Sequence, residues 1–228
     1  MSTEMLTEPQ TVTRVGRREL DVRGLTITTA IVSAVREERA ELAVGGEVEV
    51  LTDAFPAIVT DLRAWCRTTG HELVNVLEDA ETYRLRLRRG APRPNDHRLA
   101  IVVSTDGLEQ LLSPLGFALA AALGGAQVAV YLQGPAVHLL GCGFRPRLHG
   151  IARPFSRFAR AGLEKAGHVS PAEKLRQLQA LGAQLYACEP SLEHFGVDPK
   201  RLAFDDVIVC EYLTFTEVMQ QADVQLYA

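Results

Sequence analysis

Residues 184–196 read QLYACEPSLEHFG, and this stretch decides the fold of the second half of the chain. Its first five residues, Gln184–Cys188, have the character of a buried strand. A helix is expected directly after them, because Pro190 suits a first helical turn and Gly196 suits a helix end. A strand that passes at once into a helix is typical of the units that build a parallel sheet.

The rest of the second half repeats this order. Apolar strands are expected at Leu99–Val103 and Gln127–Leu132, with a helix over Leu108–Leu123 between them. A capping box, in which Ser170 is the cap and Glu173 the acidic partner, predicts another helix start. The later elements are a strand at Val207–Val209, a helix from Thr214 or Thr216 to about Ala222, and a strand at Val224–Tyr227. We therefore expect a three-layer α/β domain with a mainly parallel sheet.

Residues 141–169 differ from the rest of this half. They carry a set of basic residues against a single acid, Glu164, together with prolines and glycines. The basic residues are Arg145, Arg147, Arg153, Arg157, Arg160 and Lys165. Because the apolar periodicity is weak, we expect an irregular basic insertion that lines an entrance or a contact between subunits.

The first half predicts a smaller sheet in the order βαβαββ. Strands are expected at Glu19–Val22, Glu47–Leu51, His71–Leu77 and Thr82–Arg88. Thr28 or Thr29 is expected to cap one helix, and a second helix has Pro56 in its first turn and ends at Gly70. The expected fold is a two-layer sandwich, with both helices on one side of the sheet.

Residues 89–97, RGAPRPNDH, form the clearest break in the sequence. We expect a flexible tail at 1–13, a first domain at 14–90, a linker at 91–97 and a second domain at 98–228. The 228 residues carry a net charge of −4, and no apolar run reaches the roughly 18 residues that a membrane span needs. The polar, acidic start of the chain is unlike a signal or transit peptide. We expect a cytoplasmic protein that binds neither nucleic acid nor membrane.

Four cysteines in such a compartment are expected to be free thiols. Cys188 is the candidate for chemistry, because it ends a strand just before a helix, where unpaired amides and the helix dipole favour a thiolate. The adjacent Glu189 opposes this, and a buried strand-end thiol is the alternative reading. Cys66 is expected in a helix core. Cys210 is expected to pack, with Cys188 nearby if their strands are neighbours, and Cys142 is an accessory thiol or an incidental loop residue.

The remaining candidates depend on position alone. Ser104 and Thr105 follow the first strand of the second half and are expected to face the same crevice as Cys188, or else to cap the next helix. His194 is a candidate proton donor or a surface histidine. His149, His168, His194 and Cys188 together have metal-binding chemistry, but their spacing gives no support for a site, and no Cys-x-x-Cys pair exists. We expect no metal and no cofactor.

The first half resembles a TusA/SirA-type sulfur carrier domain. The matching stretches are Leu20–Leu25, Glu47–Asp53, Leu62–Arg67, Gly70–Leu73 and Tyr83–Leu85. After Arg-Gly-Leu-x the family has Cys-Pro-x-Pro, whose cysteine holds the sulfur, whereas this chain reads Ile-Thr-Thr-Ala at 27–30. The resemblance therefore implies a copy without the carrier thiol, used for docking a partner or for oligomer contacts.

The second half resembles the DsrE/DsrF-like family, especially its larger peroxiredoxin-labelled branch. The resemblance rests on the Ser-Thr-Asp turn at 104–106, the small-residue helix, Val128–Tyr131 and above all Tyr186–Val197. In the family a cysteine at the place of Cys188 precedes a Ser-Met-x-x-x-Gly helix, and Leu192 stands here where methionine is common. The resemblance implies a three-layer α/β fold, homo-oligomers such as trimers or hexamers, and Cys188 as the sulfur-handling thiol.

The resulting hypothesis is a sulfurtransferase or sulfur carrier that holds sulfane sulfur as a persulfide on Cys188. Its partners would be sulfur donor and acceptor proteins, and its chemistry would be thiol exchange. The alternative is a non-catalytic module that docks a partner or senses reactive sulfur, supported by the missing carrier cysteine. A third, weaker hypothesis is a metal or small-ligand site in the crevice of the second half.

Overall fold

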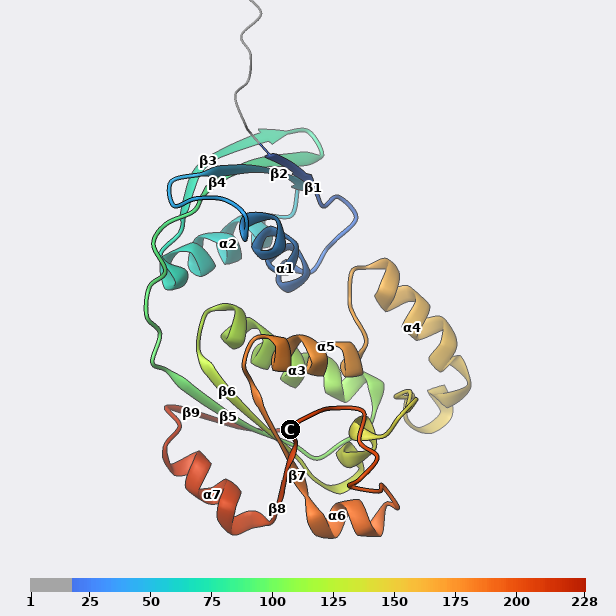
Figure 1. The fold of residues 1–228 in the computed structure, drawn as a ribbon. Coiled ribbons are helices and arrows are strands. Elements are labelled where there is room, and N and C mark those ends of the chain that lie inside the picture. The colour runs from blue at the N-terminus through green and yellow to red at the C-terminus, as the bar shows by residue number, and fades with distance from the viewer. Residues whose placement is uncertain (1–17) are drawn as a thin grey trace, which may run out of the picture.

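The computed structural model describes residues 18–228 as two α/β units stacked on one another (Figure 1). The predicted tail at residues 1–13 lies outside the described residues. The first unit has the elements β1 (Arg18–Asp21), α1 (Thr28–Arg39), β2 (Glu47–Asp53), α2 (Pro56–Thr69), β3 (Glu72–Asp79) and β4 (Thr82–Arg88). This is the predicted order βαβαββ.

The first sheet has the strand order β1-β2-β4-β3, in which only the β1–β2 pair is parallel. Both helices cover one face, where Val50 and Leu85 of the sheet join Ile31 and Leu62 of the helices in one core. The other face carries ion pairs such as Arg84 with Glu49. The alternation of buried and partly exposed residues along β2 and β4 explains why sequence patterning found these strands.

The second unit is the predicted three-layer domain. Its elements are β5 (Arg98–Val103), α3 (Leu108–Leu123), β6 (Gln127–Leu132), the 3-10 helices η1 (Gly134–Leu140) and η2 (Gly150–Phe155), α4 (Ser156–Lys165), α5 (Pro171–Ala180), β7 (Gln184–Cys188), α6 (Glu189–His194), β8 (Ile208–Cys210), α7 (Tyr212–Gln220) and β9 (Val224–Tyr227). The sheet order is β8-β7-β6-β5-β9, and every pair is parallel. Helices α3 and α5 cover one face, and α7 covers the other (Figure 1).

Several local predictions are confirmed and two are corrected. Ser170 caps α5 as expected, since its Oγ accepts a hydrogen bond from the Glu173 amide at 3.2 Å. The cap of α1 is Ile27 rather than a threonine, and no side chain caps this helix. The basic insertion contains η2 and α4, which the sequence did not reveal because α4 buries only Ser156 and so has no continuous apolar stripe.

The two units meet through their helices. Helix α1 lies against α3, and the Trp65 indole of α2 donates to the Leu123 carbonyl at the end of α3, at 3.0 Å. The Thr26 hydroxyl donates to the Ala166 carbonyl at 2.8 Å. The layers therefore run sheet, helices, helices, sheet, helix (Figure 1). As a result, the α7 face of the second sheet points away from the first unit.

Candidate functional site

Two thiols lie side by side at the carboxyl ends of neighbouring strands. The register of β7 and β8 places Cys188 opposite Cys210. Adjacent strands are about 4.8 Å apart, and residues in register share a face of the sheet. Both cysteines belong to the cluster on the α7 face, so their side chains lie on the side away from α3 and α5. The predicted site residue Cys188 thus has Cys210, which the sequence favoured as packing, for its neighbour.

Aromatic rings enclose this thiol pair. Tyr131 of β6 stacks on Phe215 of α7 with ring centroids 4.7 Å apart, and Tyr212 meets Tyr131 edge-on at 6.5 Å. Cys188 is only 1% exposed, whereas Cys210 is partly exposed. Solvent therefore reaches the pair from the side of Cys210.

Burial controls the ionisation of these groups. It raises the pKa of the Cys210 thiol, and the neighbouring Cys188 raises it further. It also raises the pKa of Tyr131, with a second contribution from Cys188, so the phenol stays protonated at neutral pH.

The Tyr131 hydroxyl is a buried donor beside the Cys188 thiol. Tyr131 is 1% exposed, and its hydroxyl has no partner in standard hydrogen-bond geometry among residues 18–228, while its side-chain interaction with Cys188 contributes to its raised pKa. A buried hydroxyl without a well-formed hydrogen bond is costly. An anionic sulfur on Cys188 would accept from it, because Cys188 is close enough to perturb its ionisation.

The expected amide stabilisation of Cys188 is not seen. Cys188 is the N-cap of α6, but its side chain makes no capping hydrogen bond. Helix α6 has only 6 residues, and Pro190 in its first turn has no N–H to offer. The helix N-terminus that drew attention to Cys188 in the sequence is therefore a weaker feature than the neighbouring thiol and phenol.

The predicted accessory residues lie apart from this pair. The Ser104 hydroxyl donates to the Ala228 carbonyl at 2.7 Å, and Thr105 Oγ1 accepts from the Gly107 amide at 3.2 Å. Neither residue caps α3, because its N-cap is Gly107 and no side chain makes a capping bond there. His194 is exposed at the end of α6, and its ring packs edge-on against the ring of Phe195. Cys142 is exposed in a turn, where its Sγ donates to the Arg201 carbonyl at 3.7 Å. None of these contacts involves Cys188.

Cys66 is a core residue of α2, as predicted. It is buried among the helices of the first unit, and burial raises the pKa of its thiol to about 11. A buried thiol with such a pKa is a poor nucleophile at neutral pH. Cys66 therefore does not replace the carrier thiol that is missing at Ile27.

Ile27 lies at the start of α1, where α1 meets the second unit. The preceding Thr26 donates both its amide and its hydroxyl to the Ala166 carbonyl. Leu25 packs closely on Gly167. A Cβ atom added at Gly167 would lie only 3.0 Å from Cδ2 of Leu25. The segment that carries the thiol in sulfur carrier domains is here used for contact within the chain.

The histidines do not gather into a metal site. Within residues 18–228 there is no group of three or more His, Cys, Asp or Glu residues that could hold a metal ion. His138 and His149 flank Asp106, at 3.0 Å and 3.8 Å from its carboxylate oxygens. His168 lies near Lys174, and His194 is on α6. The structure therefore does not bring His149, His168 and His194 together around Cys188.

Comparisons with known proteins identify both halves. Residues 18–89 match the family described as sulfurtransferase TusA, and residues 97–227 match the DsrE/DsrF-like family. Among solved structures the chain is similar to the ychN protein from E. coli, with 17% identity over 59% of this chain and 100% of that chain, at a TM-score of 0.44. No curated protein matches. None of the helices in residues 18–228 is long and apolar enough to cross a membrane.

Proposed function

The chain belongs to the DsrE/DsrF-like family and carries a TusA-type domain in front of it, and from this premise we propose that it is a cytoplasmic sulfur-trafficking protein that holds sulfane sulfur as a persulfide on Cys188. Both families point to a role in sulfur relay. The observation that carries the finer proposal is the pairing of Cys188 with Cys210 beside the buried Tyr131 hydroxyl, which interacts with Cys188.

The partly exposed thiol receives the sulfur first. The Cys210 thiolate attacks the outer sulfur of a donor persulfide, so that a new S–S bond forms on Cys210 while the donor's S–S bond breaks and the donor leaves as a thiolate. The Cys188 thiol then gives up its proton and attacks the same outer sulfur. The bond to Cys210 breaks, and Cys210 leaves as a thiolate that takes up the proton. In the first step the donor persulfide is reduced to a thiol as Cys210 gains the sulfane sulfur, and the second step moves that sulfur within the chain, so no other oxidant or reductant is needed.

The Tyr131 phenol supplies the polar contact that the buried sulfur needs. The thiolate is the nucleophile in each exchange, and a buried anion is stable only if a donor faces it. The phenol remains a donor at neutral pH because its pKa is raised. The contact of this hydroxyl with Cys188, which is not a well-formed hydrogen bond in the resting protein, becomes a charge-assisted hydrogen bond when sulfur on Cys188 is charged.

The proposed partners are sulfur donor and acceptor proteins, together with further copies of this chain. The α7 side of the second sheet carries large apolar side chains that a single chain leaves exposed, including Ile208, Tyr212, Leu213 and Tyr227. Such a surface, close to the thiol pair, supports a homo-oligomer, a trimer or a hexamer. Light scattering that gives the mass of one chain would contradict this part of the proposal.

The direct test is intact mass after incubation with cysteine persulfide. We expect the full chain to gain one sulfur atom that peptide mapping places on Cys188, and the Cys188→Ser variant to lose this stable adduct. Cys142→Ser is the matched control, because Cys142 is exposed and makes no contact with the pair. An adduct of unchanged amount in Cys188→Ser would overturn the proposal.

A second candidate is a non-catalytic module that docks a partner or senses reactive sulfur. It is favoured by the burial of Cys188 and by the use of the α1 start as a contact surface. The two candidates differ in thiol reactivity. Under the second, neither thiol of the pair would be alkylated or sulfurated faster than free cysteine, and the docking surface would still bind its partner after Cys188→Ser.

A further inference from the structure

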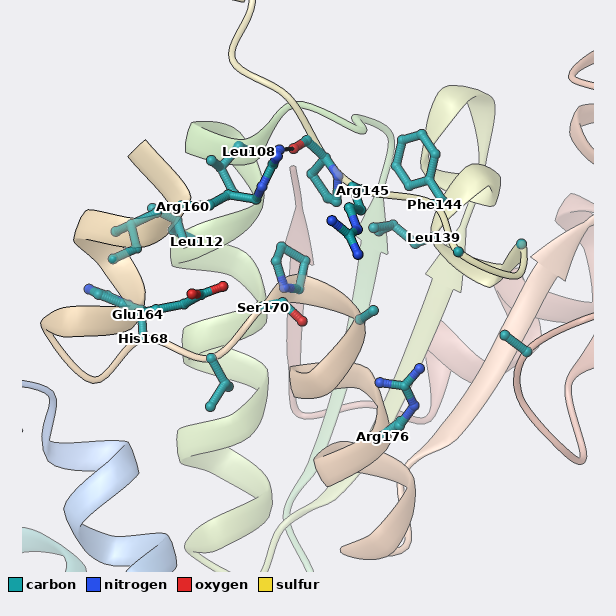
Figure 2. A pocket seen from close by; sticks show the side chains of 18 of the residues that line it. Leu108, Leu112, Leu139, Phe144, Arg145, Arg160, Glu164, His168, Ser170 and Arg176 are labelled. Carbon is teal, nitrogen blue, oxygen red and sulfur yellow. Dashed lines mark hydrogen bonds between the residues drawn. The ribbon is translucent and has the colours of Figure 1, made fainter. Parts of the chain in front are cut away.

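A cavity of 440 Å³ lies on the opposite face of the second sheet from the thiol pair. Its walls come from α3, α4, α5 and the loop after η1, so it is formed largely by the basic insertion (Figure 2). The apolar part of the wall includes Leu108, Leu112, Leu139, Leu163 and Phe204. No cysteine lines it, and its volume is within the range of small-molecule sites, roughly 300 to 1,000 Å³.

Three arginines from three different elements line this cavity. Arg145 comes from the loop, Arg160 from α4 and Arg176 from α5. Figure 2 shows Arg145 directed toward the middle of the cavity, with Arg160 above it and Arg176 below. The cavity is open to solvent, since Arg145 and Arg176 are exposed and Arg160 is half-buried. Arginine side chains that meet at one cavity from separate elements are a recognition arrangement for acidic groups.

The arginines differ in what already holds them. The Arg160 guanidinium donates to the Pro146 carbonyl at 3.0 Å, which fixes its position without neutralising its charge. Arg176 pairs with Glu173 at 3.0 Å. Within residues 18–228, no carboxylate lies within 4.0 Å of the Arg145 or Arg160 guanidinium. The lining contains one acid, Glu164, against the three arginines, and neither Arg145 nor Arg160 forms an ion pair with it.

The start of α5 adds to the positive potential of the same space. Ser170, Pro171 and Ala172 all line the cavity. The Ser170 hydroxyl already accepts a hydrogen bond from the Glu173 amide, and Pro171 has no N–H. The Ala172 amide, at the second helical position, has no acceptor within its helix. A helix start beside two arginines without ion pairs adds to the attraction of the cavity for an anion, which comes mainly from the arginines.

We propose that this cavity binds a small organic acid, with its carboxylate or phosphate head on Arg145 and Arg160 and its apolar body along Leu112 and Leu163. An inorganic anion would leave the apolar wall empty, and a neutral apolar molecule would leave the two arginines unpaired. The proposal does not depend on the sulfur chemistry of Cys188, because the sheet lies between the two sites.

Calorimetric titration of the full chain with octanoate, octanol and acetate tests the class of ligand. Octanoate has both a carboxylate and a long alkyl chain. Octanol has the alkyl chain without the charge, and acetate has the carboxylate without the chain. We expect octanoate to bind at least about tenfold more tightly than either, since it alone makes both the charge-assisted hydrogen bonds and the apolar contacts. Equal binding of octanol, equal binding of acetate or no binding of octanoate would each overturn the proposal.

Variants then test the place of binding. Arg145→Gln should weaken octanoate about tenfold or more, and Leu163→Trp should weaken it by filling the apolar part of the cavity. Arg157→Gln is the matched control, because Arg157 is an exposed arginine of α4 that does not line the cavity. Cys188→Ser should leave the affinity unchanged, which separates this site from the sulfur site. Equal loss in Arg145→Gln and Arg157→Gln would show only general charge attraction and would overturn the proposal.

Discussion

Ile27 and Cys188 occupy equivalent places in the two halves of the molecule, and their surroundings differ. Each is the N-cap of a helix in extended conformation, with φ −108° and ψ 116° at Ile27 and φ −70° and ψ 114° at Cys188. Neither side chain makes a capping hydrogen bond. Ile27 borders the contact between the two units, whereas Cys188 lies on the outer sheet face with a second thiol and the buried Tyr131 phenol.

This difference shows that a helix start does not by itself make a thiol site. Cys188 differs because the two strands that flank β7 supply its neighbours. Strand β8 carries Cys210, and strand β6 carries Tyr131. At Ile27 the neighbouring segment supplies a backbone carbonyl that holds the α1 start in place. The first unit therefore acts as a docked scaffold, and the second holds the proposed chemistry. Each of the following changes tests that division.

Cys210→Ser should have the largest effect on the sulfur site short of removing Cys188. If Cys210 receives the sulfur, its loss leaves the buried Cys188 without a partner in place, and loading of Cys188 should slow by about a hundredfold, a small part of what proximity contributes. Stopped reactions analysed by intact mass would measure this rate. Loading of Cys188 at an unchanged rate in Cys210→Ser would show that donors reach Cys188 directly.

The pH dependence of alkylation tests the ionisation of Cys210. Because burial and Cys188 raise its pKa, only a small fraction is thiolate at neutral pH, and that fraction should grow about tenfold per pH unit until the pKa is reached. Iodoacetamide labelling of Cys210, followed by mass spectrometry in the Cys142→Ser background, should still be rising where a free cysteine has levelled off. A plateau at the pH of free cysteine would contradict the raised pKa.

Tyr131→Phe should slow sulfur loading by about fivefold, the usual net value of one hydrogen bond. The same change removes a buried hydroxyl whose contact with Cys188 is not a well-formed hydrogen bond, so the free energy of unfolding should change little. Chemical denaturation and loading rates measured on one preparation would separate these effects. Phe215→Leu is a useful control, since it loosens the same cluster without removing a donor. A loss of stability in Tyr131→Phe with unchanged loading would assign Tyr131 a purely structural role.

The sequence predicted both folds because their signals are local. The limits of α3, β6 and β7 follow from continuous apolar runs and from the break at Gly124-Gly125, and the start of α5 follows from its capping box. Strand order is not local, so the pairing of β7 with β8, and with it the approach of Cys210 to Cys188, could not be read from spacing. The burial of the Tyr131 hydroxyl could not be predicted either, because it requires the packing of α7 on β6. Helix α4 was missed because so little of it is buried.

Ile27→Cys in the Cys188→Ser background should have the smallest effect, and it tests the other side of the comparison. The change restores a thiol at the place where sulfur carrier domains have one. The α1 start is held against the second unit by Thr26, and the second sheet lies between it and Cys210. We therefore expect sulfur retention to stay at the level of Cys188→Ser alone, measured by intact mass after cysteine persulfide. Retention restored to that of the unmodified chain would mean that the first unit opens and still works as a carrier.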